Sequence, residues 1–317
     1  MKKTLLALLA ASLPLSPAWA QGYPSQPIRM IVPFGAGGIT DTTARMFAEG
    51  LSRELGQTVV VENRAGAAGA IAASAVANAK PDGHTLLVIT NGMYAVNPLI
   101  YKKLAYDPKR DFTYVAMLAN TPTILAVAPG SASRTLKELL RKAAEQPEKI
   151  AFSTAGEGSD NYQVMQLLQQ ASGVKMLHVP YKSGPESLTA LISGSVDVTA
   201  ISAVTAVGFV ESGQIRPFAV TSSRRLANLP DIPTVGEVLG KPLEGGSLSG
   251  IAVPARTPPE IVKRLNAAIA VVAKSDAVQR NIYARGSERV EGSQEAFAAR
   301  VAAEQKKWEG ILGSAAQ

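Results

Sequence analysis

The stretch IVPFGAGGITD, residues 31–41, decides how this chain begins to fold. The apolar run 28–32 predicts a strand, and apolar residues at helical spacing over 41–55 predict a helix that Gly56 ends. Between them lie three glycines within four positions, Gly35 to Gly38. Because glycine has no Cβ, its backbone N–H groups can face a bound molecule directly. The stretch therefore predicts a strand-to-helix loop that exposes backbone at the carboxyl end of a strand.

Strand-like and helix-like runs alternate along the rest of the chain, which predicts an α/β fold. The expected strands are 28–32, 59–61, 85–89, 123–127, 150–153, 177–179, 196–201, 217–221 and 250–253. The expected helices are 41–55, 67–79, 135–146, 160–172, 185–192, 259–273 and 293–312. Few strands follow residue 221, so the C-terminal part is expected to complete the first sheet. This predicts a discontinuous domain 1 (21–123 and 222–317), a domain 2 (124–221), and a ligand cleft between them.

Residues 1–20 are expected to be a signal peptide rather than part of the fold. Lys2 and Lys3 precede a short apolar run, and Ala18-Trp19-Ala20 is a small-x-small cleavage site. The alternative is a short membrane anchor, but the apolar run is too short to span a bilayer. We therefore expect export with cleavage after Ala20.

Composition excludes several classes of function. The chain has 32 basic and 25 acidic residues without a basic block, and 5% aromatic residues, which argues against nucleic-acid binding. It has no cysteine, and His84 and His178 are its only histidines, so no metal site is expected. No nucleophile and base are paired, so no catalytic residues are expected. The glycine run lacks the dinucleotide and P-loop spacings, and no cofactor is expected.

The loop 33–40 suits an oxyanion, either carboxylate or phosphate, because a helix N-terminus follows it. The candidate binding residues there are Phe34, Gly35, Ala36, Gly37, Gly38 and Asp41. Two roles stay open for Asp41: a first-turn acid favoured by the helix dipole, or an acceptor for a ligand amine, hydroxyl or water. The glycines have a structural alternative too, a merely tight turn.

A second loop of this kind, 153–159, leads into the helix predicted at 160–172, where Ser159 is a suitable N-cap. Two such loops, one in each domain, favour a ligand held between the domains. Other candidates follow predicted strands: Lys182 is either a ligand contact or a solvated lysine. The binding residues predicted outside the first loop are Asn91, Tyr94, Thr154, Ala155, Gly156, Ser159, Asp160, Tyr181, Lys182 and Ser202.

Several longer motifs, spread over nearly the whole chain, resemble those of one family. They are YPSQPIRMIVPFGAGGITDTTAR (23–45), VVVENRAGAAGAIAA (59–73), PDGHTLL (81–87), DFTYVAMLA (111–119), HVPYKSGPESLTALISGSVDV (178–198), RPFAVTSSRR (216–225) and DIPTVGE (231–237). Together they resemble the Bug-type, or TctC-type, substrate-binding proteins of tripartite tricarboxylate transporters. The resemblance implies a type II-like periplasmic-binding-protein fold, with two mostly parallel sheets flanked by helices.

The resemblance also implies a function. It implies a non-enzymatic, monomeric solute-binding protein that closes on a small organic carboxylate and delivers it to inner-membrane permease subunits. The alternative is a sensor that presents its closed form to a receptor kinase. Ser202-Ala203 stands where the family often has Asp-Asn, and residues 247–249 lack a common aromatic. The ligand is therefore left open among mono- and dicarboxylates, aromatic acids and amino acids.

Overall fold

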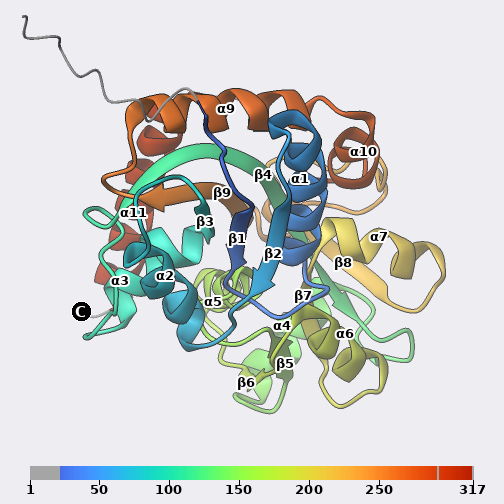
Figure 1. Cartoon of the computed structure of the whole chain (residues 1–317). Coiled ribbons are helices and arrows are strands. Elements are labelled where there is room, and N and C mark those ends of the chain that lie inside the picture. The colour runs from blue at the N-terminus through green and yellow to red at the C-terminus, as the bar shows by residue number, and fades with distance from the viewer. Residues whose placement is uncertain (1–21, 291–292, 316–317) are drawn as a thin grey trace, which may run out of the picture.

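The structure, a computed structural model, describes residues 22–290 and 293–315 (Figure 1). The signal peptide predicted at 1–20 lies outside the described residues. The strands are β1 (Ile28–Val32), β2 (Val59–Asn63), β3 (Thr85–Thr90), β4 (Phe112–Val127), β5 (Ala151–Thr154), β6 (Leu177–Pro180), β7 (Val198–Ser202), β8 (Arg216–Val220) and β9 (Gly246–Pro254).

The helices alternate with these strands, as the sequence predicts. The α-helices are α1 (Ile39–Leu55), α2 (Ala70–Ala77), α3 (Asn97–Ile100), α4 (Leu136–Glu145), α5 (Asp160–Ser172), α6 (Gly184–Ile192), α7 (Ala203–Glu211), α8 (Val235–Leu239), α9 (Pro259–Ala273), α10 (Asp276–Val278) and α11 (Gln294–Ala315). Three short turns of other helix types are η1 (Ala67–Gly69), η2 (Gly92–Val96) and η3 (Gln279–Tyr283). No described helix is both long and apolar enough to cross a membrane.

One long strand, β4, joins two sheets. Its first part pairs antiparallel with β9, from Phe112 opposite Pro254 to Pro122 opposite Gly246. Its last part pairs antiparallel with β7 and β8. The strand order is β2-β1-β3-β9-β4-β7-β5-β6, with β8 also on β4. In Figure 1, β4 arches over the molecule from one sheet to the other.

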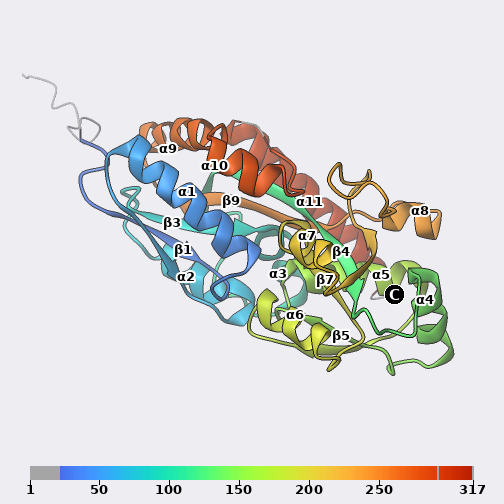
Figure 2. The same ribbon diagram turned by 90° about the vertical axis from the view of Figure 1, so that its right-hand side faces the viewer.

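The predicted α/β class with two sheets is confirmed. In the first sheet β1 pairs parallel with β2 and β3, and in the second β5 pairs parallel with β6 and β7. Each parallel half adjoins antiparallel strands, because β4 and β9 run between the two sheets in opposite directions. Figure 2 shows the resulting two lobes: the first contains α1, α2 and α9, and the second contains α4, α5 and α6.

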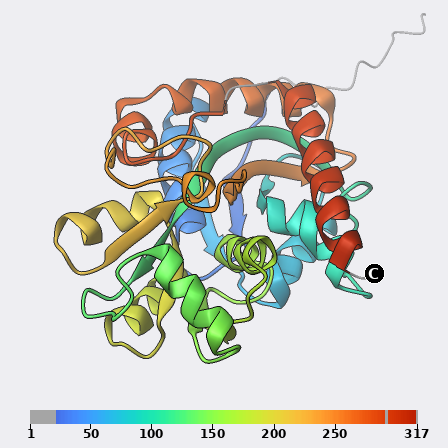
Figure 3. The ribbon, with the colours of Figure 1, turned by 180° about the vertical axis from the view of Figure 1, so that it is seen from behind.

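Each sheet is buried on both faces, as expected for α/β proteins. In β1, Met30 and Val32 belong to a core that α1 and α9 cover, whereas Ile31 belongs to a core with residues of α2 and α11. Seen from behind, α11 lies across the first lobe (Figure 3). The last residues of β4 alternate in the same way between the two cores of the second lobe.

The chain passes between the lobes next to residues 121–123 and 245–247. The amide of Thr221 donates to the carbonyl of Thr123 (2.9 Å), and its hydroxyl donates to the carbonyl of Gly245 (2.6 Å). Leu226 and Leu243 pack in the cores of the second lobe. Residues between about 222 and 245, which the sequence assigned to domain 1, thus accompany the second sheet before the chain returns.

The close packing of β9 against α11 gives a test of this architecture. A Cβ at Gly250 would overlap the ring of Phe297 and lie 2.7 Å from the carbonyl oxygen of Ala116. We expect Gly250→Ala to lower the free energy of unfolding by about 1–3 kcal/mol, as overpacked cores do. Denaturant titration measures this change.

The matched control for that substitution is Gly310→Ala in α11. Gly310 is exposed, and a Cβ there meets no atom within 4 Å. Alanine in a helix interior is favoured over glycine by roughly 0.5–1 kcal/mol, so this variant should be unchanged or slightly more stable. Equal stability of the two variants would contradict the packing of β9 against α11.

Candidate functional site

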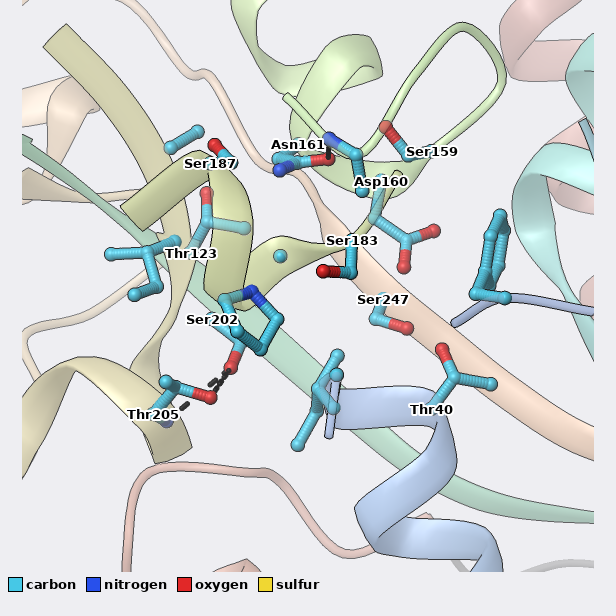
Figure 4. Close-up of a pocket in the computed structure, with 18 of the residues that line it drawn as sticks. Thr40, Thr123, Ser159, Asp160, Asn161, Ser183, Ser187, Ser202, Thr205 and Ser247 are labelled. Carbon is cyan, nitrogen blue, oxygen red and sulfur yellow. Dashed lines mark hydrogen bonds between the residues drawn. The ribbon is translucent and has the colours of Figure 1, made fainter. Parts of the chain in front are cut away.

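A pocket lies between the two lobes and encloses roughly 700 Å³, part of it open to solvent (Figure 4). Its lining comes from both lobes. The lining residues are Phe34, Gly35, Gly38, Ile39, Thr40, Thr123, Ala155, Ser159, Asp160, Asn161, Ser183, Gly184, Pro185, Ser187, Thr199, Ala200, Ile201, Ser202, Thr205 and Ser247. Apolar side chains and small hydroxyls dominate, so the pocket suits a small molecule with few polar groups.

The N-terminus of α1 opens into this pocket. Gly38 is the N-cap residue, and no described side chain caps the helix there. Gly38, Ile39 and Thr40 all line the pocket. The first amides of a helix have no partner within the helix and carry its partial positive charge. This end of α1 can therefore bind an anion.

Asp41 lies just behind this N-terminus and holds the glycine loop in place. Its carboxylate accepts from the Gly37 amide (2.9 Å), from Asn63 Nδ2 (2.8 Å) and from Arg45 Nε (3.0 Å). Burial favours a higher pKa for Asp41, but the hydrogen bonds from these three groups hold the pKa below its usual value. Asp41 and Gly37 are thus partnered within the protein, and neither lines the pocket.

The loop before α5 forms the facing wall. Thr154 is buried and lies 2.7 Å from His178 Nε2, and it accepts from the Gly156 amide (3.1 Å). Ser159 caps α5 by accepting from the Tyr162 amide. Of the residues predicted in this loop, Ala155, Ser159 and Asp160 line the pocket, whereas Thr154 and Gly156 support the loop from behind.

Two further helices begin at the pocket. Ser183 caps α6, and Ser183 and Pro185 line the pocket. Ser202 caps α7 by accepting from the Thr205 amide (3.3 Å), and both line it. The N-termini of α1, α5, α6 and α7 therefore converge on one cavity. The sequence did not predict α7, although the Ser202 to Thr205 spacing is an N-cap signal.

The pocket offers a bound anion no cationic side chain from the described residues. Within the described part of the chain its lining holds no lysine, arginine or histidine, and Asp160 is its one ionisable residue. Asp160 is buried, and its Oδ1 has no hydrogen-bond partner among the described residues. Burial raises the pKa of Asp160 to about 7. Ser247 opposes this rise only in part, because burial has the larger effect on the pKa.

Other predicted residues lie away from the pocket. Asn91 donates to Gln163 Oε1 (3.2 Å) and to the Gly246 carbonyl (3.1 Å), which ties the two lobes together. Tyr94 is fully buried in the core of the first lobe. Tyr181 packs partly buried against the core of the second lobe, Lys182 is exposed, and neither lines the pocket. Ala36 does not line it either.

Comparison with known proteins places this site in context. Residues 43–316 match the family described as "Tripartite tricarboxylate transporter family receptor". The chain is 34% identical to Rpa4515 of R. palustris, solved with adipate (TM-score 0.87; 93% of this chain and 98% of that one). It is 32% identical to MatC of Rhodopseudomonas palustris, solved with malate (TM-score 0.87; 91% and 99%). The periplasmic binding protein BugD is 32% identical (TM-score 0.88; 93% and 99%).

The buried carboxyl of Asp160 predicts a particular dependence of stability on pH. An unfolded carboxyl titrates near 3.8 and the folded one at about 7, so the folded state binds the proton more tightly. The contribution of Asp160 to stability is therefore lost as pH rises from about 4 to about 7. We expect Asp160→Asn to match wild type at pH 4 and to be more stable at pH 8, by up to about 4 kcal/mol. Urea titrations of ligand-free protein measure both.

The control is Asp276→Asn, which neutralises an exposed first-turn acid of α10. Its ion pair with Arg280 is exposed, so we expect the substitution to change stability by less than about 1 kcal/mol. If Asp160→Asn followed wild type just as closely between pH 4 and pH 8, the carboxyl of Asp160 would not be buried in the free protein.

Proposed function

The chain belongs to the tripartite tricarboxylate transporter receptor family, and on that premise we propose that it is a periplasmic solute-binding protein for a small organic carboxylate. Members of this family are receptors that bind solutes, not enzymes. Rpa4515 and MatC were solved with adipate and malate, which are both small carboxylates.

The observation that carries the proposal is the uncapped N-terminus of α1 in a pocket without cationic side chains. Its first-turn amides are left for a ligand oxyanion, and the N-termini of α5, α6 and α7 add their partial charges. Each helix end contributes roughly 0.3–1 kcal/mol at exposed sites and up to ~2 kcal/mol when partly buried. Together with burial of the ligand's apolar surface against Phe34 and Ile201, this fits a micromolar Kd, about −8 kcal/mol.

Capture requires the lobes to move, and the proposed mechanism is hinge closure. The segments 121–123 and 245–247 are the proposed hinge, since the chain passes between the sheets only there within the described residues. Two loops meet across the pocket mouth: a Cβ at Gly35 would lie 3.3 Å from Ser183 Cβ. The expected domain 1 (21–123 and 222–317) is then proposed to close on domain 2 (124–221). Of domain 1, we propose that residues 222–245 move together with domain 2, because Leu226 and Leu243 pack in its cores.

Delivery completes the proposed function. The chain is proposed to be exported, cleaved after Ala20 and present as a monomer in the periplasm. It would deliver its ligand to membrane permease subunits. Its membership of a transporter receptor family supports this transport role over presentation of the closed form to a receptor kinase.

The general test is a thermal-shift screen of residues 21–317 against mono-, di- and tricarboxylates, acidic amino acids and aromatic acids. A ligand that binds only the folded state adds ~2.7 kcal/mol of stability at a hundredfold excess over Kd. We expect a clear rise in Tm with one chemical class. Folded, ligand-free protein that responds to no carboxylate would overturn the proposal.

A sharper test fills the anion position with a side chain. Gly38 has φ −73°, which any residue adopts, and an aspartate at an N-cap satisfies the first-turn amides. We expect Gly38→Asp to keep or raise the Tm of the free protein. It should weaken carboxylate binding at least a hundredfold, because its carboxylate competes for the same donors and repels the ligand. Calorimetry with the carboxylate found in the screen measures the loss.

Gly38→Ala is the control, since a Cβ at this position makes only an ordinary 3.7 Å contact with the Gly35 carbonyl. Alanine adds neither charge nor a cap, so binding should fall only a few-fold. Wild-type affinity in a folded Gly38→Asp protein would place the carboxylate elsewhere in the pocket.

A further inference from the structure

Asp160 is a first-turn acid of α5, and in its ionised form it offers no donor to a carboxylate ligand. A carboxylate ligand needs donors, yet the one ionisable side chain in the lining is itself an acid. We infer that Asp160 recognises a cationic nitrogen, so that the ligand is an amino carboxylate carrying both charges. This inference rests on the proposed function, because it adds a second anchor to the carboxylate held by the helix ends.

The geometry around Asp160 matches an ammonium group. Its Oδ1 is buried and unpartnered, and so is the hydroxyl of Ser247 on β9. Figure 4 shows Asp160 and Ser247 on the same side of the cavity, with their oxygens near each other. A protonated amine has three donors and no acceptor, so it can satisfy both oxygens at once. A ligand hydroxyl can donate to only one of these oxygens, and it carries no charge to oppose ionised Asp160.

The positions of the two anchors limit the spacing of the two charges. Thr40, in the first turn of α1, is drawn on the same side of the cavity as Asp160 and Ser247 in Figure 4, and all three line the pocket. The carboxylate at α1 and the ammonium at Asp160 therefore belong to one end of the ligand, as in an α-amino acid. The far side of the cavity, where Thr123 and Ser202 lie, is left for the ligand's side chain.

The ionisable groups around Asp160 allow a clear dependence on pH. Helix α5 packs against β5, β7 and β9, which carry no ionisable side chain. The buried Tyr94 stays neutral because its pKa is raised, and Asp41 across the pocket has a lowered pKa. On the second lobe, burial lowers the pKa of His178, and Glu157 acts against that shift. An effect near pH 7 that disappears in Asp160→Asn thus belongs to Asp160.

The test uses calorimetry on wild type, Asp160→Asn and the control Asp276→Asn with matched pairs of ligands. Each pair is an amino acid and the same acid without its amino group: L-leucine and 4-methylpentanoate, L-glutamate and glutarate, L-phenylalanine and 3-phenylpropanoate. A buried, charge-assisted contact is worth roughly 10- to 150-fold in affinity. We expect one amino acid to bind wild type at least tenfold more tightly than its partner, and Asp160→Asn to lose that preference.

The direction in which affinity changes with pH distinguishes two roles of Asp160: accepting from an ammonium group, or donating to a carboxylate. An ammonium binds ionised Asp160, so affinity for the amino acid should fall as pH drops from 8 to 6 in wild type and Asp276→Asn. Tighter binding of the deaminated acid, strengthening as pH falls, would mean that protonated Asp160 donates to a carboxylate. That result would overturn the inference and leave the proposed function standing. If neither member of any pair bound, and if no carboxylate in the thermal-shift screen raised the Tm, both the inference and the proposed function would be overturned.

Discussion

The site depends on one constraint, the continuous strand β4 that belongs to both sheets. β9 pairs with one part of β4, and β7 and β8 pair with the other part. This pairing decides which edges of the two sheets adjoin each other. The carboxyl ends of β1, β5, β6 and β7 then face the same cavity, and the helix after each strand begins there. Four helix N-termini meet as a consequence of topology, without any long-range ion pair in the lining.

Binding an anion with helix ends rather than with lysine or arginine has a physical advantage. A buried cation must be desolvated and stays uncompensated whenever the pocket is empty. Backbone amides of a first helical turn carry only partial charge, so their exposure in an empty pocket costs little. The glycine loop serves this arrangement: Asp41 fixes the turn through the Gly37 amide, and Gly38 leaves the helix end open.

Local sequence signals predicted most of the helices and strands around the site. The elements that they did not predict depend on pairing between segments far apart in the sequence. The strand at Ile28–Val32 and the helix at Pro259–Ala273 were predicted with the observed bounds, because apolar periodicity and turn residues mark both ends. The first half of β4 and the helix α7 were not predicted. Continuous apolar and small residues fit either a strand or a helix, and only pairing with β9 or packing on β7 decides. Asn91 and Tyr94 likewise follow a strand but pack between elements that the sequence does not place together.

Asp160 shows how an unfavourable group can indicate function. Replacing it by a neutral residue would relieve the cost of burying a carboxyl at neutral pH. Its Oδ1 accepts no hydrogen bond from the described residues. Binding sites commonly retain such costs, because the ligand supplies the missing partner. A cation bound there would return the stability that the empty pocket loses as pH rises.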